Sequence, residues 1–357
     1  MESGKEKSWQ EGNSMDNIVS FIETYKYHIL YMANIVIGFL GAYWIQSSFL
    51  RSRLINAPNE RDSHSEPIPR GAGIGILLAF MLSGLVLRLP TTMIYAVIIV
   101  GVVSFYEDHF STPIKFRLSV QFTTAILFLF PYFAARRSVG WIGFISIGIL
   151  VILIVGTANL FNFMDGINGI AAITASVGFG LLWFDNSIVE KKVLVQNAPL
   201  GLLAVCIAIS CLGFLPFNIP KARAFLGDVG SITLGFLFGG LSVYLAKSRF
   251  DLLCSLGFLI PFYMDEAISV IKRIRKGQSL LIPHRGHLYQ LLANELHIPH
   301  WKISLSYGFA QIVLGVAVIL LRPNGPALII LIWVSSFFGM AILYYAVGKK
   351  ISGTKSL

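Results

Sequence analysis

The sequence Asn159-Leu-Phe-Asn-Phe-Met-Asp-Gly-Ile-Asn-Gly169 joins two long apolar runs, at about 140–159 and 168–184. Apolar runs of this length are typical of helices that cross a membrane. The stretch between them carries three asparagines and an aspartate. Polar groups at the end of a membrane segment are costly unless they meet water, a partner or a ligand. We therefore interpret residues 159–169 as the floor of a site.

Composition favours a polytopic helical membrane protein. Of 357 residues, 55% are hydrophobic and only 13% are charged, whereas about a quarter are charged in a soluble domain. The expected fold class is all-α with about 11 (10–11) transmembrane helices and an active site on the cytoplasmic face. The predicted spans lie at about 28–50, 72–88, 91–106, 117–134, 140–159, 168–184, 198–215, 229–246, 252–271, 303–321 and 326–346.

We expect one integral-membrane domain at 28–346, a polar N-terminal extension at 1–27 and a basic C-terminal tail at 347–357. No cleavable signal peptide is evident, and the polar extension is consistent with a disordered tail. If the loop after the first span faces the cytoplasm, most Lys and Arg residues lie on that side. The positive-inside rule then places the N-terminus outside and the C-terminus in the cytoplasm. The net charge of +10 is thus attributed to loops facing anionic lipid or substrate rather than nucleic acid.

Chemically suggestive residues gather in the predicted cytoplasmic connections. The outward connections, such as 185–199, are short and show no such constellation. Solvated loops would scatter polar residues over both faces, so the one-sided clustering predicts a site at the cytoplasmic surface. The five inward connections are 56–73, 107–117, 159–169, 225–231 and 272–302.

Two of these connections carry carboxylates suited to a metal. Glu107 and Asp108 are adjacent and repel each other unless a cation or basic group lies between them. Mg²⁺ prefers oxygen ligands and binds through one or two carboxylates plus substrate phosphates. Asp228 lies in Gly-Asp-Val-Gly-Ser, where small residues allow close approach of a ligand. The alternatives are a solvated helix end for the pair and an N-cap of the eighth span for Asp228.

Asn159, Asn162 and Asp165 are spaced three apart, so on a helix they share one face. Amides and a carboxylate on one face can bind a nucleobase or sugar, or complete a metal shell. Hydrogen bonding between helices is the alternative, and it explains one asparagine better than three polar groups.

Basic residues suggest phosphate binding. His284, Arg285 and His287 lie in a basic loop, where Arg offers a bidentate fork and His a further donor. The alternative is a positive-inside anchor. Lys115 and Arg117, near the start of the fourth span, are placed to meet a lipid phosphate, although ordinary snorkelling explains either residue alone.

Two further patterns are interpreted as structural. Asp265 precedes Arg273 by eight residues, close to one helical face, which predicts an ion pair between them. Gly71-Ala-Gly-Ile-Gly75 follows no strand, so it is not a dinucleotide loop. It predicts close packing or a tight turn before the second span.

Together these motifs resemble the polyprenyl-phosphate N-acetylhexosamine-1-phosphate transferases, glycosyl transferase family 4. The resemblance runs from about Asn56 to Gln290, with the motifs in the family's order. The stretches that carry it are Pro58-Asn-Glu-Arg-Asp-Ser-His64 with Pro69-Arg-Gly-Ala-Gly73, Glu107-Asp108, Asn159–Gly169, Phe225-Leu-Gly-Asp-Val-Gly-Ser231 and His284-Arg-Gly-His-Leu-Tyr-Gln290.

The resemblance implies transfer of an N-acetyl-amino-sugar-1-phosphate from a UDP-sugar to undecaprenyl phosphate, with release of UMP. Such a product primes O-antigen, enterobacterial common antigen, teichoic acid or another surface glycan at the bacterial inner membrane. The implied cofactor is Mg²⁺, with Mn²⁺ as an alternative. Membrane lipid is an expected partner, nucleic acid is not, and a homodimer is left open.

The resemblance also implies roles for individual residues. Catalytic roles fall to Asp108, Glu107 and Asp228, with Asp228 and Asp108 as metal ligands. Nucleotide-sugar binding falls to Asn159, Asn162, Asp165, Asn168, His284, Arg285 and His287. Lipid phosphate binding falls to Lys115, Arg117, Arg61 and His64.

The chain departs from the family pattern at two positions. Glu107 replaces the first aspartate of an Asp-Asp pair, and Asn168 replaces an aspartate common after Asp165-Gly. The His-Arg-Gly-His sequence favours the amino-sugar branch over the phospho-N-acetylmuramoyl-pentapeptide translocase branch, which carries three consecutive histidines. That branch remains an alternative, as do a lipid-linked transporter and a non-catalytic scaffold.

Overall fold

The computed structural model describes residues 2–47, 55–56, 67–110, 112–134, 141–189, 199–278 and 286–355, and nearly all of them are helical. The one sheet in this part of the chain pairs two short antiparallel strands. The elements are α1 (Glu2–Ser47), β1 (Ile55–Asn56), β2 (Ile68–Pro69), α2 (Ile74–Val86), α3 (Thr91–Glu107), α4 (Ile114–Ala134), α5 (Trp141–Phe163), α6 (Ile170–Val189), α7 (Pro199–Phe214), η2 (Leu215–Phe217), α8 (Gly227–Leu245), α9 (Arg249–Leu256), η3 (Gly257–Leu259), α10 (Ile260–Arg275), α11 (Leu288–Gln290), η4 (Leu291–Glu295), α12 (His300–Leu321), η5 (Arg322–Asn324) and α13 (Pro326–Lys355).

The all-α membrane fold is confirmed. Among the described residues, eight helical stretches are long and apolar enough to cross a membrane. Each remaining predicted span is also a helix: α2 and α3 are shorter apolar helices, and α6 has 20 residues. Large apolar side chains are exposed on α5, α12 and α13, as with Phe144, Phe309 and Tyr345. In a soluble protein such surface would be a liability, whereas a multi-pass protein turns it to lipid.

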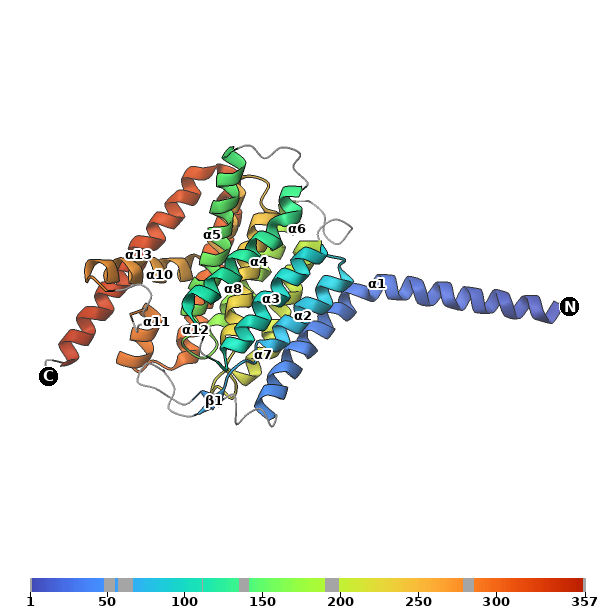
Figure 1. Ribbon diagram of the computed structural model, residues 1–357, viewed down its shortest axis with the longest axis horizontal. Helices are drawn as coiled ribbons and strands as arrows, with labels where there is room; N and C mark the ends of the chain where they lie inside the picture. Colours follow the sequence, from blue (N-terminus) through green and yellow to red (C-terminus); the bar gives the residue numbers. More distant parts are fainter. Residues whose placement is uncertain are drawn as a thin grey trace.

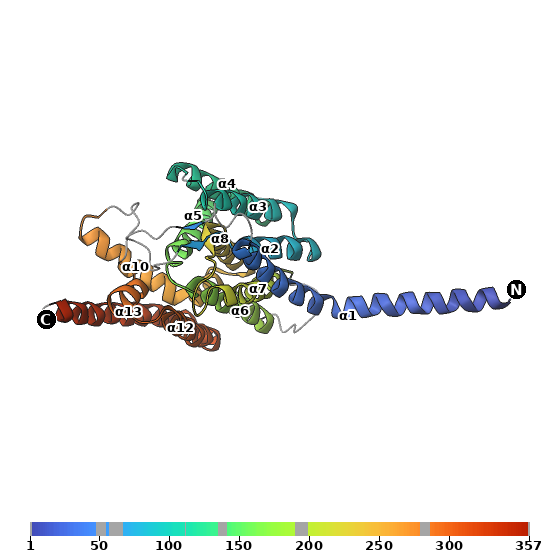
Figure 2. The ribbon, with the colours of Figure 1, turned by 90° about the horizontal axis from the view of Figure 1, so that it is seen from below.

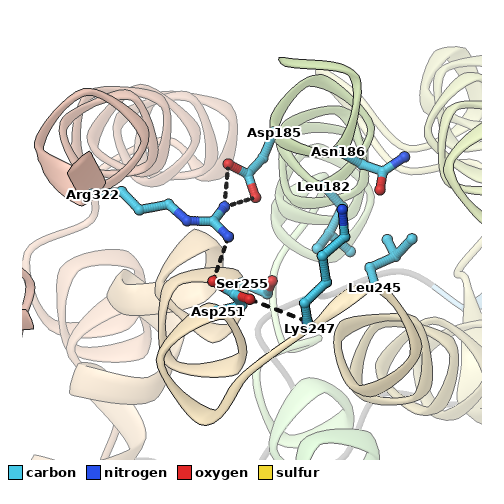
Figure 3. Close-up of a pocket in the computed structure, with 8 residues that line it drawn as sticks. All are labelled: Leu182, Asp185, Asn186, Leu245, Lys247, Asp251, Ser255 and Arg322. Carbon is cyan, nitrogen blue, oxygen red and sulfur yellow. Dashed lines mark hydrogen bonds and ion pairs between the residues drawn. The ribbon is translucent and has the colours of Figure 1, made fainter. Parts of the chain in front are cut away.

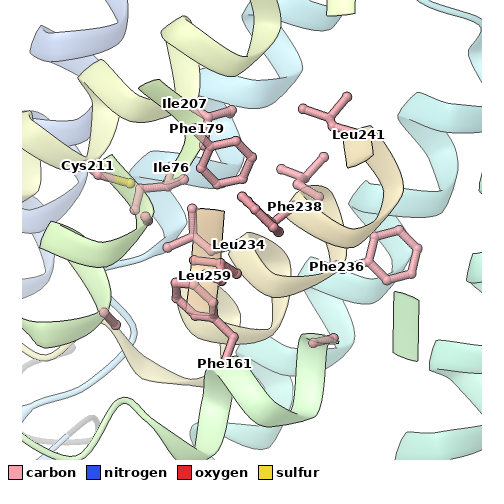
Figure 4. Packing of buried hydrophobic residues seen from close by; sticks show 14 of the residues in the cluster. Ile76, Phe161, Phe179, Ile207, Cys211, Leu234, Phe236, Phe238, Leu241 and Leu259 are labelled. Atoms are coloured by element: carbon pink, nitrogen blue, oxygen red, sulfur yellow. The ribbon is translucent and has the colours of Figure 1, made fainter. Parts of the chain in front are cut away.

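Helix α8 is the centre of the bundle. Figure 2 shows α3 and α4 on one side of it and α12 and α13 on the other. Its phenylalanines Phe236 and Phe238 are fully buried and point to different sides (Figure 4). Phe238 packs against Phe179 of α6, and Phe236 packs against Phe128 of α4. An α-helix that is apolar on all faces is buried on all sides. The surrounding helices therefore pack around α8.

Glycines allow α2 to touch its neighbours backbone to backbone. A Cβ at Gly73 would overlap Gly230 of α8, and a Cβ at Gly41 of α1 would overlap Gly75. Gly71 has φ +101°, a conformation that other residues seldom adopt. The expectation of close packing and a tight turn at residues 71–75 is therefore confirmed, whereas the expectation that no strand precedes them is wrong, because β2 ends at Pro69.

The structure changes the prediction at two places. The N-terminal extension, expected as a disordered tail, is helical from Glu2 and continues into the first span as α1, which projects from the bundle in Figure 1. The predicted span 252–271 is three successive helices, α9, η3 and α10. Pro261 stands in the first turn of α10, where its ring prevents the helix from continuing backwards.

Candidate active site at the ends of α3, α5 and α8

Backbone hydrogen bonds join the first and fourth predicted cytoplasmic connections. Ala72 N–H donates to Phe225 O at 2.9 Å, and Phe225 N–H donates to Pro69 O at 2.8 Å. Gly73 N–H donates to Leu226 O at 2.8 Å. The segment after β2 is thereby held against the start of α8, next to Asp228.

Asp108 caps α8 from a distance in sequence. Its carboxylate accepts the backbone N–H of Asp228 at 2.7 Å and of Val229 at 3.1 Å. The first amides of a helix have no partner within it, and a carboxylate there is favoured by the helix dipole. A Cβ at Gly227 would collide with the same carboxylate, so the Gly-Asp-Val-Gly sequence is what lets Asp108 reach these amides.

Asp228 is not the N-cap that the sequence left as an alternative. It lies in the first turn of α8, and the N-cap position is Leu226. Asn162 of α5 donates to its Oδ1 at 2.9 Å, and Arg117 of α4 approaches its Oδ2 at 3.9 Å. The side chain stays 19% exposed. Asp228 is thus oriented by two neighbours and remains open to a ligand.

Neither Glu107 nor Lys115 takes part in the hydrogen bonds that Asp108 makes with the start of α8 and Asp228 makes with Asn162. Glu107 forms an ion pair with Arg117 at 3.2 Å and accepts a hydrogen bond from Thr112 at 2.9 Å, and its side chain is only 4% exposed. Lys115 is exposed on the first turn of α4. Arg117, predicted to meet a lipid phosphate, therefore lies between Glu107 and Asp228 in this structure.

The three aspartates share one electrostatic environment. Burial, and then the nearby Asp228 charge, raise the pKa of Asp108 to about 7 against the opposing effects of Arg70 and the two amides. Burial raises the pKa of Asp165 well above its usual range, and Asp228 and Asp108 add to the rise while Arg70 opposes it. A cation beside these carboxyls would favour their charged forms, so the cluster suits a cation ligand.

The predicted helical face of Asn159, Asn162 and Asp165 does not include Asp165, because helix α5 ends at Phe163. Asn159 donates to Gln121 of α4 at 2.6 Å, which is the hydrogen bonding between helices that the sequence offered as the alternative. Asn162 donates to Asp228 at 2.9 Å and to Ser231 at 2.8 Å.

The turn after α5 is held by residues that sequence reasoning missed. Gly169 has φ +84°, and its N–H donates to Asn218 Oδ1 at 2.5 Å. Asn168 N–H donates to His300 Nδ1 at 3.4 Å, and Asn168 O accepts from Ser304 at 2.7 Å. Nothing local in the sequence marks Asn218, His300 or Ser304, since each lies far along the chain from the turn.

Two residues near the last connection, His287 and Asp265, are buried. His287 Nδ1 lies 3.4 Å from Glu266 and 3.7 Å from Asp265. Asp265, for which an ion pair with Arg273 is predicted, accepts hydrogen bonds from Tyr307 and from the backbone N–H of Leu288, because the chain after residue 286 folds back over α10.

Four predicted site residues, Arg61, His64, His284 and Arg285, lie outside the described residues. Within the described ranges, no group of three or more His, Cys, Asp or Glu side chains is arranged to hold a metal ion by itself. Mg²⁺ needs only one or two carboxylates when substrate phosphates complete its shell. The partly exposed Asp228, beside two further aspartates, fits that requirement.

A second charged cluster lies at the other end of the bundle, where the sequence analysis found none. Arg322 of η5 donates to both oxygens of Asp185 at 2.8 and 2.7 Å and to Asp251 of α9 at 2.5 Å (Figure 3). The cluster joins three connections that the sequence analysis places on the outward face. Consecutive members of this cluster are 66 or more positions apart in the sequence, so no local sequence pattern predicts that they meet.

Comparison with known proteins finds a family model and several relatives with similar sequences. Residues 90–246 match the sequence model of glycosyl transferase family 4. A decaprenyl-phosphate N-acetylglucosaminephosphotransferase of Mycolicibacterium smegmatis is 26% identical over 78% of each chain. A probable undecaprenyl-phosphate N-acetylglucosaminyl 1-phosphate transferase of Bacillus subtilis is 26% identical over 67% of this chain and 69% of its own. A phospho-N-acetylmuramoyl-pentapeptide-transferase of Fervidobacterium nodosum is 29% identical over 59% of this chain and 69% of its own. The matched segment contains Glu107, Asp108, the Asn159–Gly169 turn and Asp228, and over these residues the chain is similar to glycosyl transferase family 4.

Proposed function

We propose that this protein transfers an N-acetyl-amino-sugar-1-phosphate from a UDP-sugar to undecaprenyl phosphate, releasing UMP, as the first membrane step of a surface glycan such as O-antigen. The N-terminus lies outside and the C-terminus in the cytoplasm of the inner membrane. The names of the relatives support a polyprenyl phosphate acceptor and an N-acetylglucosamine phosphate group.

The observation that carries the proposal is the arrangement of Asp108, Asn162 and Asp228. Asp108 fixes the first turn of α8, and Asn162 fixes the carboxylate of Asp228 at the surface of the site. Phosphoryl transfer depends mainly on positioning and charge neutralisation. A rigidly held, partly exposed aspartate with arginines beside it is suited to that chemistry.

The residues present divide the task. Asp228 would hold Mg²⁺, with the charge of Asp165 acting on the same site. Mg²⁺ supplies neutralisation of the diphosphate charge when it is bound. Asp108 keeps Asp228 in place, since both of its oxygens already accept amides. Arg117 changes partner from Asp228 to the phosphate of the acceptor lipid, for which its guanidinium has a matching geometry.

In the reaction, an oxygen of the lipid phosphate forms a bond to the β-phosphorus of the donor. The bond between that phosphorus and the bridging oxygen breaks, and UMP leaves with the bridging oxygen. A phosphate monoester has a second pKa near 6, so much of the nucleophile is dianionic at neutral pH. This chain therefore needs no strong general base, and Glu107, paired with Arg117, orients that arginine.

The experiment is an assay of the purified protein with radiolabelled UDP-GlcNAc, undecaprenyl phosphate and Mg²⁺ in detergent. The expected result is labelled lipid with equimolar UMP, and no product when Mg²⁺ is chelated. UDP-GalNAc and deoxy-amino-sugar donors tested in parallel identify the preferred donor. Absence of UMP with every donor would overturn the proposal, and UMP release without any ion gradient excludes a pure transporter.

A second candidate is transfer of phospho-N-acetylmuramoyl-pentapeptide, because a relative of that name is also similar to the chain. The two candidates differ in the donor alone. Turnover of UDP-N-acetylmuramoyl-pentapeptide in preference to UDP-GlcNAc would select the second.

A further inference from the structure

Asp265 of α10 and the groups that donate hydrogen bonds to it form a buried cluster, and none of them has a chemical role in the proposed transfer. Asp265 of α10 is fully buried. Its carboxylate accepts four hydrogen bonds, from Leu288 N–H at 2.8 Å, Tyr289 N–H at 3.4 Å, Tyr307 OH at 2.5 Å and Tyr344 OH at 2.5 Å. A carboxylate offers about four acceptor positions, so Asp265 is saturated.

The donors come from three different elements. Tyr307 belongs to α12, Tyr344 to α13, and Leu288 and Tyr289 to α11. One side chain of α10 thereby holds α11, α12 and α13 together. Buried hydrogen bonds to a charged acceptor are stronger than neutral ones, so this junction has a defined geometry.

Tyr289 extends from this junction to the turn after α5. The residue is fully buried, and its hydroxyl donates to Phe163 O, at the last residue of α5, at 2.9 Å. A Cβ at Gly166 would overlap the same hydroxyl. The tyrosine therefore contacts the chain on both sides of Asp165. His287 stacks on its ring, with centroids 5.6 Å apart and an interplanar angle of 18°.

We propose that Asp265 is a positioning residue, which acts through Tyr289 to fix the turn that carries Asp165 beside Asp228. The inference rests on the proposed transfer only for its kinetic consequence. Asp265 is too deeply buried to touch a substrate. Its effect is to set the backbone of the turn, because Tyr289 N–H is held at one end of the residue and its hydroxyl at the other.

The experiment compares Asp265→Asn, Tyr289→Phe and their double variant with a matched control, Asp185→Asn, in the full-length protein. An asparagine at 265 has one acceptor oxygen and turns an amide toward the remaining donors. Tyr289→Phe keeps the ring packing and removes only the bond to Phe163 O. Asp185 also accepts partly buried hydrogen bonds, but at the opposite end of the bundle, so it reports loss of stability alone.

We expect Asp265→Asn to lower kcat/KM by on the order of 10²-fold, as for a small displacement of a positioned group. Tyr289→Phe lowers it less, and the double variant falls no further than Asp265→Asn, because interacting sites are not additive. Asp185→Asn lowers Tm and leaves kcat/KM within about twofold of the wild type. Full additivity of the two single variants, or an unchanged kcat/KM in Asp265→Asn, would overturn the positioning role.

Amide hydrogen exchange separates this inference from the proposed function. Asp265→Asn is expected to speed exchange in residues 162–169 as well as in 286–295, while Asp185→Asn speeds neither. This measurement needs no turnover, so it stands even if the wild type fails to use a UDP-sugar. Faster exchange confined to 286–295 shows that the cluster holds only its own segment, which contradicts the proposal.

Discussion

At the scale of single residues, the structure gives two neighbouring aspartates different tasks. Asp108 has a fully buried side chain and accepts two backbone amides, whereas Asp228 is partly exposed and accepts a side-chain amide from Asn162. A carboxylate bound by backbone donors is part of the framework, and a carboxylate left open is available to a ligand. The difference in burial therefore separates two residues that look alike in the sequence.

Asp228→Asn tests the ligand. We expect transfer to fall by about 10³-fold, the scale of losing one key electrostatic group, while Tm stays near that of the wild type because Asn162 can still donate to the new amide oxygen. UMP release and thermal unfolding in detergent measure the two effects. Near-normal turnover at limiting Mg²⁺ would refute the metal assignment.

Asp108→Asn is expected to lower both Tm and activity. The amide has one oxygen for two backbone donors, so one N–H at the start of α8 loses its partner, which costs about 1–3 kcal/mol. Thermal unfolding in detergent measures the fall in Tm, and UMP release measures the loss of activity. If Asp108→Asn were as stable as Asp228→Asn, the capping role of Asp108 would be wrong.

Asn168→Asp tests donor choice. Two backbone hydrogen bonds, with His300 and Ser304, hold residue 168, so the substitution alters a charge and leaves the turn in place. We expect the ratio of kcat/KM for UDP-GlcNAc and UDP-GalNAc to change by more than about threefold, with Tm unchanged. An equal ratio in both proteins would show that this side chain does not contact the donor.

At the scale of elements, glycines allow the backbone of α2 to pack directly against the backbones of α1 and α8. Gly73 and Gly75 face other glycines, Gly230 and Gly41, across these contacts. In lipid, helices associate through close packing of small residues rather than through the hydrophobic effect. The backbone that follows β2 is thereby brought against Leu226, one residue before α8 begins.

Gly73→Ala is expected to lower Tm, because its Cβ would overlap the backbone of Gly230, and overpacking costs about 1–3 kcal/mol. Gly339→Ala in α13 is the matched control, since a Cβ there meets nothing within 4 Å. It is expected to leave Tm unchanged or raise it, because alanine favours a helix. Equal Tm values for the two variants would exclude the close contact.

At the scale of the whole molecule, the two ends of the bundle carry different kinds of charge. The end with Asp108, Asp165 and Asp228 keeps a partly exposed carboxylate. At the other end Arg322 forms ion pairs with Asp185 and Asp251, and the side chains of these three residues are 11–16% exposed. One end therefore keeps a carboxylate that a ligand can reach, and the Arg322 ion pairs at the other end join α6, α9 and the α12–α13 connection.

Arg322→Ala tests that division. The substitution leaves Asp185 and Asp251 near each other without the cation that pairs with both. Removing one partner of a buried ion pair costs about 3 kcal/mol. We expect a marked fall in Tm with KM for the donor unchanged. Arg322→Lys should recover only part of the Tm, because lysine lacks the bidentate fork. A raised KM in Arg322→Ala at a temperature where it is folded would show that the two ends are coupled.

The sequence by itself determined the class of fold and the four segments whose contacts make up the described site. Apolar length and period are local properties, so the spans could be located and Asp108, the 159–169 turn and Asp228 assigned to connections between them. Only the tertiary structure decided that Asp108 caps α8, that Asn159 bonds to Gln121 while Asn162 reaches Asp228, and that His287 is buried beside Asp265. It also revealed the Arg322 cluster. The physical reason is that each of these contacts joins residues 22 or more positions apart, and its geometry depends on how closely α8 and its neighbours pack.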